Sequence, residues 1–279
     1  MHEGDFQRWL SGFDEPPTEW CDRLWPGGLP FFEKADGDRA VVALHGYGAT
    51  PFEVRPVARA CSALGFDVTA PLQAGHGFRE RADQWKGFER LDPGALLECA
   101  RREVQACRAR GYDAVFAFGI SMGGALALRL AAEGRVDAVA VAAPAIRIPR
   151  VAALGEILPL RLRVALPAFK PPERFENPSY DFHSVASLRA LRGVAREARA
   201  QLSRIHCPVL VMQTRADEVI PVRVGDEIEA HVRGPLARAW FDESGHSMTV
   251  DVAGGRVAEA AASFFARVRA EGDARCHRP

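Results

Sequence analysis

The chain has no excess charge of either sign. Among its 279 residues are 36 lysines and arginines and 36 aspartates and glutamates, so the formal net charge is zero at pH 7. Lysine itself is scarce, because only Lys34, Lys86 and Lys170 are present and arginine supplies the remaining positive charge. Proteins that bind nucleic acid usually carry a basic stripe, and this sequence has none. The charge pattern therefore predicts that nucleic acid is not a partner.

The sequence also lacks long apolar runs. No stretch reaches the roughly 20 apolar residues that a membrane-spanning helix needs. The N-terminal residues have neither a basic start nor the apolar segment that is typical of a signal peptide. We therefore expect no integral membrane segment and no signal peptide.

Paired cysteines are missing as well. The six cysteines are scattered along the chain, and no two of them form a C-x-x-C pair. Such pairs are typical of zinc sites and redox motifs, so we expect no metal site here. Unpaired cysteines are ordinary in a reducing compartment, and the sequence predicts a cytoplasmic location.

What the sequence does contain is a regular alternation of apolar strands and helices. We expect strands at residues 40–44, 66–71, 114–120, 136–142, 208–213 and 237–241. We expect helices at residues 51–64, 93–110, 124–132, 222–232 and 250–269. Strands that are apolar throughout indicate a parallel sheet with helices on both faces. The expected fold class is α/β, with a mostly parallel central sheet flanked by helices.

One long segment, residues 145–206, interrupts this alternation. It is rich in arginine, proline and leucine and has no expected strand. An insertion at the carboxyl ends of parallel strands lies over the ligand site, so we interpret this segment as a helical cap. Residues 31–144 and 207–270 then form the core. Residues 1–30 are expected to be an N-terminal extension that lies on the core, and residues 271–279 a flexible tail.

The motif Gly119-Ile120-Ser121-Met122-Gly123 has the form G-x-S-x-G. It stands between an expected buried strand and an expected helix, and a serine at such a junction lies on a sharp turn that exposes its hydroxyl. Small flanking residues are needed because the turn brings the strand and helix backbones close together. The bare pattern is common, so it is this context that makes Ser121 the candidate nucleophile.

A serine hydroxyl needs an adjacent base, and the base needs an acid that orients it. In a sheet of this kind the chain order is serine, acid, histidine, with the acid and the histidine each following a strand. Asp217 follows the strand expected at 208–213, and His246 follows the one at 237–241. Glu218 is the alternative acid. Asp217 is preferred because the shorter acid lies nearer the strand end.

Backbone N–H groups are expected to form an oxyanion hole. In such sheets one donor follows the first core strand and the other follows the nucleophile. The loop His45-Gly46-Tyr47-Gly48 makes the Tyr47 N–H the first candidate donor, and the Met122 N–H is the second. The His45 side chain is expected to stabilise this loop and not to react.

Taken in order, these motifs resemble the α/β-hydrolase superfamily, specifically the small bacterial carboxylesterases and monoacylglycerol lipases. The matching segments are Leu29-Pro30-Phe31-Phe32, Leu44-His45-Gly46-Tyr47-Gly48, Ala70-Pro71, Gly75-His76-Gly77, Gly119 to Gly123, Ala143-Pro144, Asp217 to Pro221, Ser244-Gly245-His246 and Asp251. The oxyanion loop departs from the family pattern. Family members often have a small polar residue and a glycine after the aromatic residue, whereas this chain has Gly48-Ala49-Thr50.

The resemblance implies an α/β-hydrolase fold with a helical cap and a serine hydrolase that needs no metal or organic cofactor. The implied substrate is a small-molecule carboxylic ester with a short or medium acyl chain, or a monoacylglycerol. Ile146, Val219 and Ile220 are expected to line its apolar pocket. Two alternatives stay open: related chemistry, as in a C–C bond hydrolase, a thioesterase or an acyltransferase, and a ligand-binding protein with little turnover.

Overall fold

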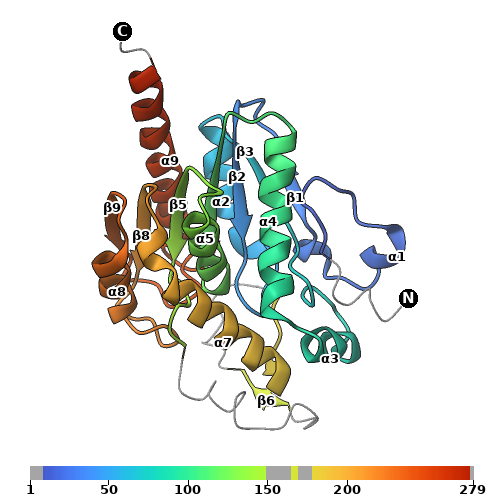
Figure 1. Cartoon of the computed structure of the whole chain (residues 1–279). Coiled ribbons are helices and arrows are strands. Elements are labelled where there is room, and N and C mark those ends of the chain that lie inside the picture. The colour runs from blue at the N-terminus through green and yellow to red at the C-terminus, as the bar shows by residue number, and fades with distance from the viewer. Residues whose placement is uncertain (1–8, 149–164, 169–177, 277–279) are drawn as a thin grey trace.

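The computed structural model describes residues 9–148, 165–168 and 178–276. Seven strands form one sheet in the order β1-β3-β2-β4-β5-β8-β9 (Figure 1). Neighbouring strands are parallel except β1, which runs antiparallel to β3. The strands are β1 (Phe31–Glu33), β2 (Arg39–Leu44), β3 (Asp67–Ala70), β4 (Ala114–Ile120), β5 (Ala138–Ala142), β8 (Val209–Gln213) and β9 (Leu236–Trp240).

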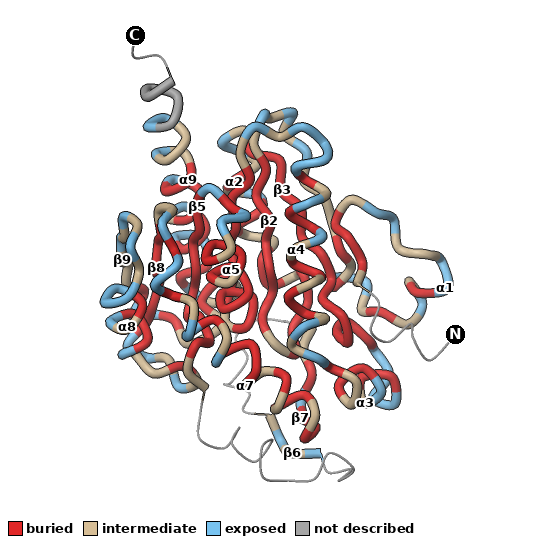
Figure 2. Tube along the Cα trace, viewed as in Figure 1, coloured by how far each residue is buried: buried red, intermediate tan, exposed pale blue. Residues whose placement is uncertain are grey.

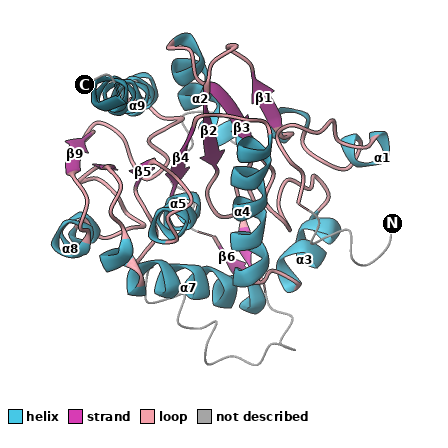
Figure 3. Cartoon of the chain, turned by 45° about the horizontal axis from the view of Figure 1, so that its top comes forward, coloured by secondary structure: helices cyan, strands magenta, loops and turns pink. Residues whose placement is uncertain are grey.

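Helices cover both faces of this sheet. The α-helices are α1 (Thr18–Cys21), α2 (Arg55–Ala63), α3 (Arg81–Glu89), α4 (Pro93–Ala109), α5 (Met122–Ala132), α7 (Val185–Ala200), α8 (Arg223–His231) and α9 (Gly254–Cys276). Helices α2 and α9 pack together on one face, and α4, α5 and α8 lie on the other (Figure 3). Helix α7 packs across α4 and α5. None of the helices in the described ranges is long and apolar enough to cross a membrane.

The sheet separates two hydrophobic cores. In β2, Val41 and Ala43 belong to the core beneath α2 and α9, whereas Val42 and Leu44 belong to the core beneath α4 and α5. All four side chains are completely buried, and Figure 2 shows the buried strands as the centre of the molecule. Burial on both faces explains why the strand is apolar at every position and does not alternate.

The predicted fold class and the mostly parallel sheet are confirmed. Each of the six predicted strands is present, with bounds within two residues of the expected ones. Strand β1 and helix α3 were not predicted. The last helix was expected to end at residue 269, with a flexible tail from 271, but α9 continues to Cys276. The flexible tail stays a prediction for residues 271–276, and residues 277–279 lie outside the described part of the chain.

The insertion at residues 145–206 is described in part. Helix α7, the principal element there, begins with a capping box in which Ser184 and Ser187 bond reciprocally to each other's backbone N–H. The insertion was expected to hold no strand, but β6 (Leu166–Pro167) and β7 (Phe182–His183) pair antiparallel. The rest of the predicted cap, 149–164 and 169–177, lies outside the described residues.

The N-terminal segment packs against the core from residue 9 onward, and a buried carboxylate on α4 holds part of it. The Ser11 hydroxyl and the Gly12 N–H donate to Glu103 Oε1 at 3.2 and 3.0 Å, and Thr69 Oγ1 also donates to this oxygen. Oε2 of Glu103 has no hydrogen-bond partner among the described residues. Burial outweighs the three donors and raises the pKa of Glu103 to about 7.

We predict that Glu103→Gln changes how stability depends on pH. The folded protein favours the protonated carboxyl, so its stabilising contribution is complete below the ordinary pKa of 4.5 and is lost as the pH rises through about 7. A neutral glutamine removes that loss. Relative to the wild type, the variant should gain about 3 kcal/mol of unfolding free energy between pH 5 and pH 8. Urea denaturation at several pH values measures this difference.

Glu98→Gln, on the more exposed side of the same helix, serves as the matched control and should follow the wild-type pH dependence. If the free energy of unfolding changed with pH in the same way for Glu103→Gln and the wild type, the predicted protonation of Glu103 would be contradicted.

Candidate active site

Ser121 lies on a strained turn between β4 and α5. Its φ of 53° and ψ of -116° fall in a region that residues with a side chain rarely adopt. The glycines of the motif allow the turn to form. A β-carbon at Gly119 would lie 2.2 Å from the carbonyl oxygen of Gly123, and one at Gly123 would lie 2.1 Å from that of Leu44. Neither position has room for a side chain, so the G-x-S-x-G pattern follows from the close packing of the backbone.

The structure brings Ser121, His246 and Asp217 together in one hydrogen-bonded row. Ser121 Oγ lies 3.0 Å from His246 Nε2, and His246 Nδ1 lies 2.9 Å from Asp217 Oδ2. Asp217 Oδ1 accepts the N–H groups of Val219 and Ile220 at 2.8 and 2.7 Å. These two bonds orient the carboxylate toward the imidazole. Three loops that follow β4, β8 and β9 therefore meet at one point, in the order that the sequence predicts.

The charges of this row favour an ion pair between Asp217 and His246. Burial alone would raise the pKa of Asp217, but His246 and the two N–H donors hold it below its ordinary value. Burial alone would lower the pKa of His246, but Asp217 outweighs burial and raises it above 6.5, with a further contribution from Glu53. When the His246 ring is neutral, the carboxylate holds its single proton on Nδ1, so Nε2 is able to accept the proton of Ser121.

Tyr47 and Met122, the predicted oxyanion donors, lie next to this row. Met122 is the first residue of α5, where the first N–H groups have no partner within the helix. Tyr47 follows Gly46, and a β-carbon at Gly46 would lie 3.4 Å from Ser121 Cβ. In the described part of the chain, neither the Tyr47 nor the Met122 N–H donates to another group. Both are therefore free to bind an anion.

The loop that carries Tyr47 is held from two sides. Nδ1 of His45 bonds the Gly46 carbonyl at 2.9 Å, and Nε2 accepts the Gln73 N–H at 3.1 Å. Burial and the neighbouring His76 lower the pKa of His45 to about 3, so the ring is neutral and supports the loop. On the other side, the Tyr47 hydroxyl donates to Ser187 Oγ of α7 at 2.7 Å. The loop is thereby attached to the insertion.

Glu53 is a site residue that sequence reasoning missed. Its carboxylate is buried, and Oε2 accepts the Gly46 N–H at 2.7 Å. Its negative charge also acts on His246. No motif identifies this glutamate. The only feature of the sequence that could have pointed to it is a single acidic residue between Pro51 and Val54, in the segment after the first core strand.

The three residues expected to line the substrate pocket adjoin the row through their backbones. Ile146 is buried and follows Ala145, whose N–H donates to the Ser121 carbonyl at 2.9 Å. Val219 and Ile220 supply the N–H groups that bind Asp217. An apolar acyl pocket formed by these residues stays a prediction. Among the described residues, no group of three or more His, Cys, Asp or Glu side chains is arranged to hold a metal ion.

Comparison with known protein families identifies the fold family. A family model described as "Alpha/beta hydrolase family" matches residues 41–260, which is most of the chain. The chain belongs to the α/β-hydrolase family. The resemblance recognised in the sequence motifs is thereby confirmed.

Two curated relatives are similar over most of their length. A carboxylesterase of Bacillus subtilis (strain 168) is 26% identical over 237 residues, which cover 80% of this chain and 89% of that protein. A thermostable monoacylglycerol lipase of Bacillus sp. (strain H-257) is 29% identical over 247 residues, which cover 86% of this chain and 95% of that protein.

Solved structures share the fold of this α/β hydrolase. One, from work on the metagenome-derived lipolytic enzymes LipS and LipT, has a TM-score of 0.79 at 23% identity and covers 88% of this chain and 99% of its own. The monoacylglycerol lipase of Paleococcus ferrophilus has a TM-score of 0.66 at 19% identity, with 84% and 98% covered. At these identities the likeness supports the fold and not a substrate.

We predict that Ser121→Gly is more stable than Ser121→Ala. Both variants lose the bond to His246, but only glycine adopts the backbone angles of this turn without strain. Since such strain amounts to about 1–3 kcal/mol and glycine adds entropy to the unfolded chain, the net advantage should be about 1 kcal/mol. Urea denaturation of the two variants measures it. An alanine variant as stable as the glycine variant would show that the turn is not strained.

Proposed function

We propose that this protein is a serine hydrolase that cleaves carboxylic esters, with Ser121 as nucleophile, His246 as general base and Asp217 as the acid that orients it. The observation that carries the proposal is the row of hydrogen bonds from Ser121 Oγ through His246 to Asp217, at 3.0 and 2.9 Å. The similar proteins named carboxylesterase and monoacylglycerol lipase support the same reaction class.

The reaction proceeds through an acyl-enzyme. Ser121 Oγ attacks the ester carbonyl carbon while His246 Nε2 takes the hydroxyl proton. The tetrahedral intermediate collapses, the C–O bond to the alcohol breaks, and His246 returns the proton to the departing alcohol oxygen. Water then attacks the acyl carbon and gives a proton to His246. The bond from the acyl carbon to Ser121 Oγ breaks, His246 returns the proton to Oγ, and the carboxylic acid leaves. No step needs a metal or an organic cofactor.

The oxyanion of each tetrahedral intermediate is assigned to the N–H groups of Tyr47 and Met122. A backbone donor is fixed in place before the negative charge develops, and one such donor typically lowers the barrier by about 3 kcal/mol. The N-terminal end of α5, at Met122, adds the positive end of a helix dipole. The bond from Gly46 N–H to Glu53 keeps the preceding peptide of the loop in position.

The proposed substrate is a small-molecule ester with a short or medium apolar acyl chain, or a monoacylglycerol. Ile146, Val219 and Ile220 are proposed to contact that chain, because their backbones adjoin Ser121 and Asp217. The cytoplasmic location and the absence of nucleic acid partners stay predictions from composition.

The direct test is a series of initial rates on p-nitrophenyl esters from C2 to C16. The rate of the wild type should peak at a short or medium chain. Ser121→Ala should lower kcat by about 10⁴-fold or more, since removing the nucleophile leaves only binding and the oxyanion hole. Circular dichroism of the variant controls for folding.

A wild-type rate equal to background, from folded protein, would contradict the ester hydrolase. Cleavage of a thioester or a C–C bond, or transfer of the acyl group to an added alcohol, would then identify the related reactions. Tight ligand binding without turnover would identify a ligand-binding protein.

Variants of Glu53 should change the pH dependence of kcat/KM. The wild-type rate should rise with pH as His246 loses its proton, at a pKa above the ordinary 6.5. Glu53→Gln keeps an oxygen for the Gly46 N–H but removes the charge that stabilises the imidazolium. The rising, acidic part of the curve of kcat/KM against pH (the acid limb) should therefore move to lower pH, with little loss of the maximal rate.

Glu53→Ala is the matched variant, because it removes both the charge and the acceptor oxygen. It should shift the acid limb in the same direction and also lower the maximal kcat by about tenfold, since the oxyanion loop loses a charge-assisted bond. An acid limb that stays at the wild-type pH in both variants would exclude an electrostatic role for Glu53.

A further inference from the structure

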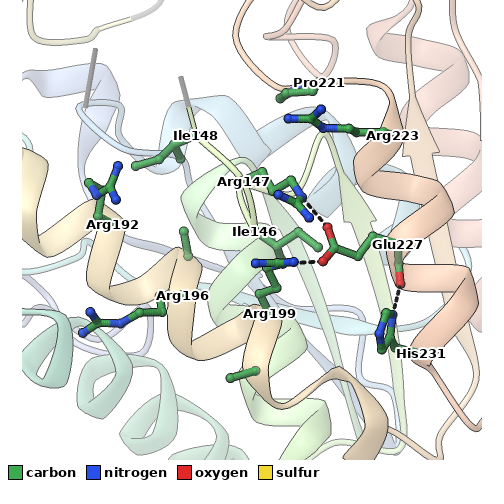
Figure 4. A pocket seen from close by; sticks show the side chains of 12 residues that line it. Ile146, Arg147, Ile148, Arg192, Arg196, Arg199, Pro221, Arg223, Glu227 and His231 are labelled. Atoms are coloured by element: carbon green, nitrogen blue, oxygen red, sulfur yellow. Dashed lines mark hydrogen bonds and ion pairs between the residues drawn. The ribbon is translucent and has the colours of Figure 1, made fainter. Parts of the chain in front are cut away.

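An arginine-rich hollow lies beside the candidate active site. Its volume is about 800 Å³, and its lining residues come from three segments: the chain after β5, helix α7, and helix α8 with the residue Pro221 before it (Figure 4). Ile146 is shared with the predicted acyl pocket. The other residues that line the hollow have no role in the proposed reaction, so the hollow is a separate feature of the molecule.

The lining carries a large excess of positive charge. Among the described residues, five arginines line the hollow, together with a single carboxylate, that of Glu227. The arginines are Arg147, Arg192, Arg196, Arg199 and Arg223. Since this protein has zero formal net charge, so many cations around one carboxylate are a local concentration and not a reflection of overall composition.

The single carboxylate is already shared by two of these cations. The Nε atoms of Arg147 and Arg199 both donate to Glu227. Figure 4 shows these two guanidinium groups directed at Glu227, whereas those of Arg192, Arg196 and Arg223 are not. Glu227 therefore holds the chain after β5 and helix α7 against α8, and its carboxylate does not pair with Arg196 or Arg223.

Helix α7 places three of the arginines on one face. Arg192, Arg196 and Arg199 are separated by four and then three residues, which is the spacing of neighbours along a helix surface. Like charges at these spacings destabilise a helix, and the only acidic residue of α7 is Glu197. A bound anion would offset this repulsion.

Two of the arginines are available to such an anion. Arg196 and Arg223 are exposed, and in the described ranges of the chain neither side chain makes a hydrogen bond or an ion pair. The planar guanidinium group binds the oxygens of a phosphate or a carboxylate in pairs. Apolar side chains lie among the cations, contributed by Ile146, Ile148, Ala195, Ala200 and Pro221.

We propose that this hollow is a second binding site, which takes a phosphate or carboxylate group attached to an apolar body. The arginines bind the oxyanion, and the isoleucines, alanines and proline contact the apolar part. This second site does not depend on ester hydrolysis, because none of the arginines that line the hollow takes part in that reaction.

Calorimetry with four probes tests the site: inorganic phosphate, octyl phosphate, octanoate and neutral octanol. Octyl phosphate or octanoate should bind with one-to-one stoichiometry, and the tighter of the two identifies the headgroup. The double variant Arg196→Gln, Arg223→Gln should weaken that binding by about tenfold or more, because two charge-assisted contacts are lost. Binding of inorganic phosphate alone, weakened by the same variant, would assign the site to the free anion.

Two further variants separate the site from general charge effects. Arg59→Gln, Arg267→Gln removes two exposed arginines from α2 and α9 on the opposite face of the sheet, and binding should stay within about twofold of the wild type. Glu227→Gln frees Arg147 and Arg199, so it should tighten binding by about threefold or more.

Three results would overturn the proposal. The first is that none of the anions binds at millimolar concentrations. The second is that the control variant Arg59→Gln, Arg267→Gln weakens binding as much as Arg196→Gln, Arg223→Gln does. The third is that octanol binds as tightly as the anions. Thermal melts of every variant confirm that each one is folded.

Discussion

The structure depends on the close approach of three backbone segments at Ser121. Strand β4, helix α5 and the end of β2 come so near one another that only glycine fits at positions 119 and 123. Ser121 itself is held in its disfavoured conformation by backbone bonds: its N–H donates to Ala142 O at 2.9 Å, and its carbonyl accepts from Ala125 and Ala145 at 3.1 and 2.9 Å. The core on both sides of the sheet maintains this packing, so the strained serine is supported by the whole fold.

The parallel sheet explains why residues far apart in sequence form one site. The carboxyl ends of parallel strands meet at one edge, and the loops after β2, β4, β8 and β9 lie along it. These four loops carry, in turn, the proposed oxyanion donor Tyr47, the proposed nucleophile Ser121, Asp217 and His246. The same edge also carries the start of α8 and the chain after β5, which is why the arginine-rich hollow adjoins the candidate active site.

Much of the fold and the central row of side chains was predictable because their signals are local. Fully buried strands are apolar at every position, and close backbone contacts require glycine, so both are visible in a short stretch of sequence. Strand β1 was missed because it has three half-buried residues and pairs with only one neighbour. Helix α3 was missed because it buries Asp83 and Gln84 as well as Phe88, which leaves no apolar periodicity.

The features that the sequence did not predict depend on interactions that form only in the folded chain. Glu53 contributes because its carboxylate accepts a hydrogen bond from the Gly46 N–H and its negative charge raises the pKa of His246. Neither interaction is encoded in a motif. The hollow joins segments that are about fifty and thirty residues apart, and composition alone shows only that arginine is common. Features of this kind need the folded arrangement before their chemistry is visible.

Covalent labelling of the nucleophile measures whether His246 activates Ser121. The wild type and His246→Ala would be treated with a fluorophosphonate, and the modified peptide identified by mass spectrometry. We expect a single adduct on Ser121 in the wild type and almost none in the variant. Equal labelling of both proteins, or an adduct on another serine, would contradict this expectation.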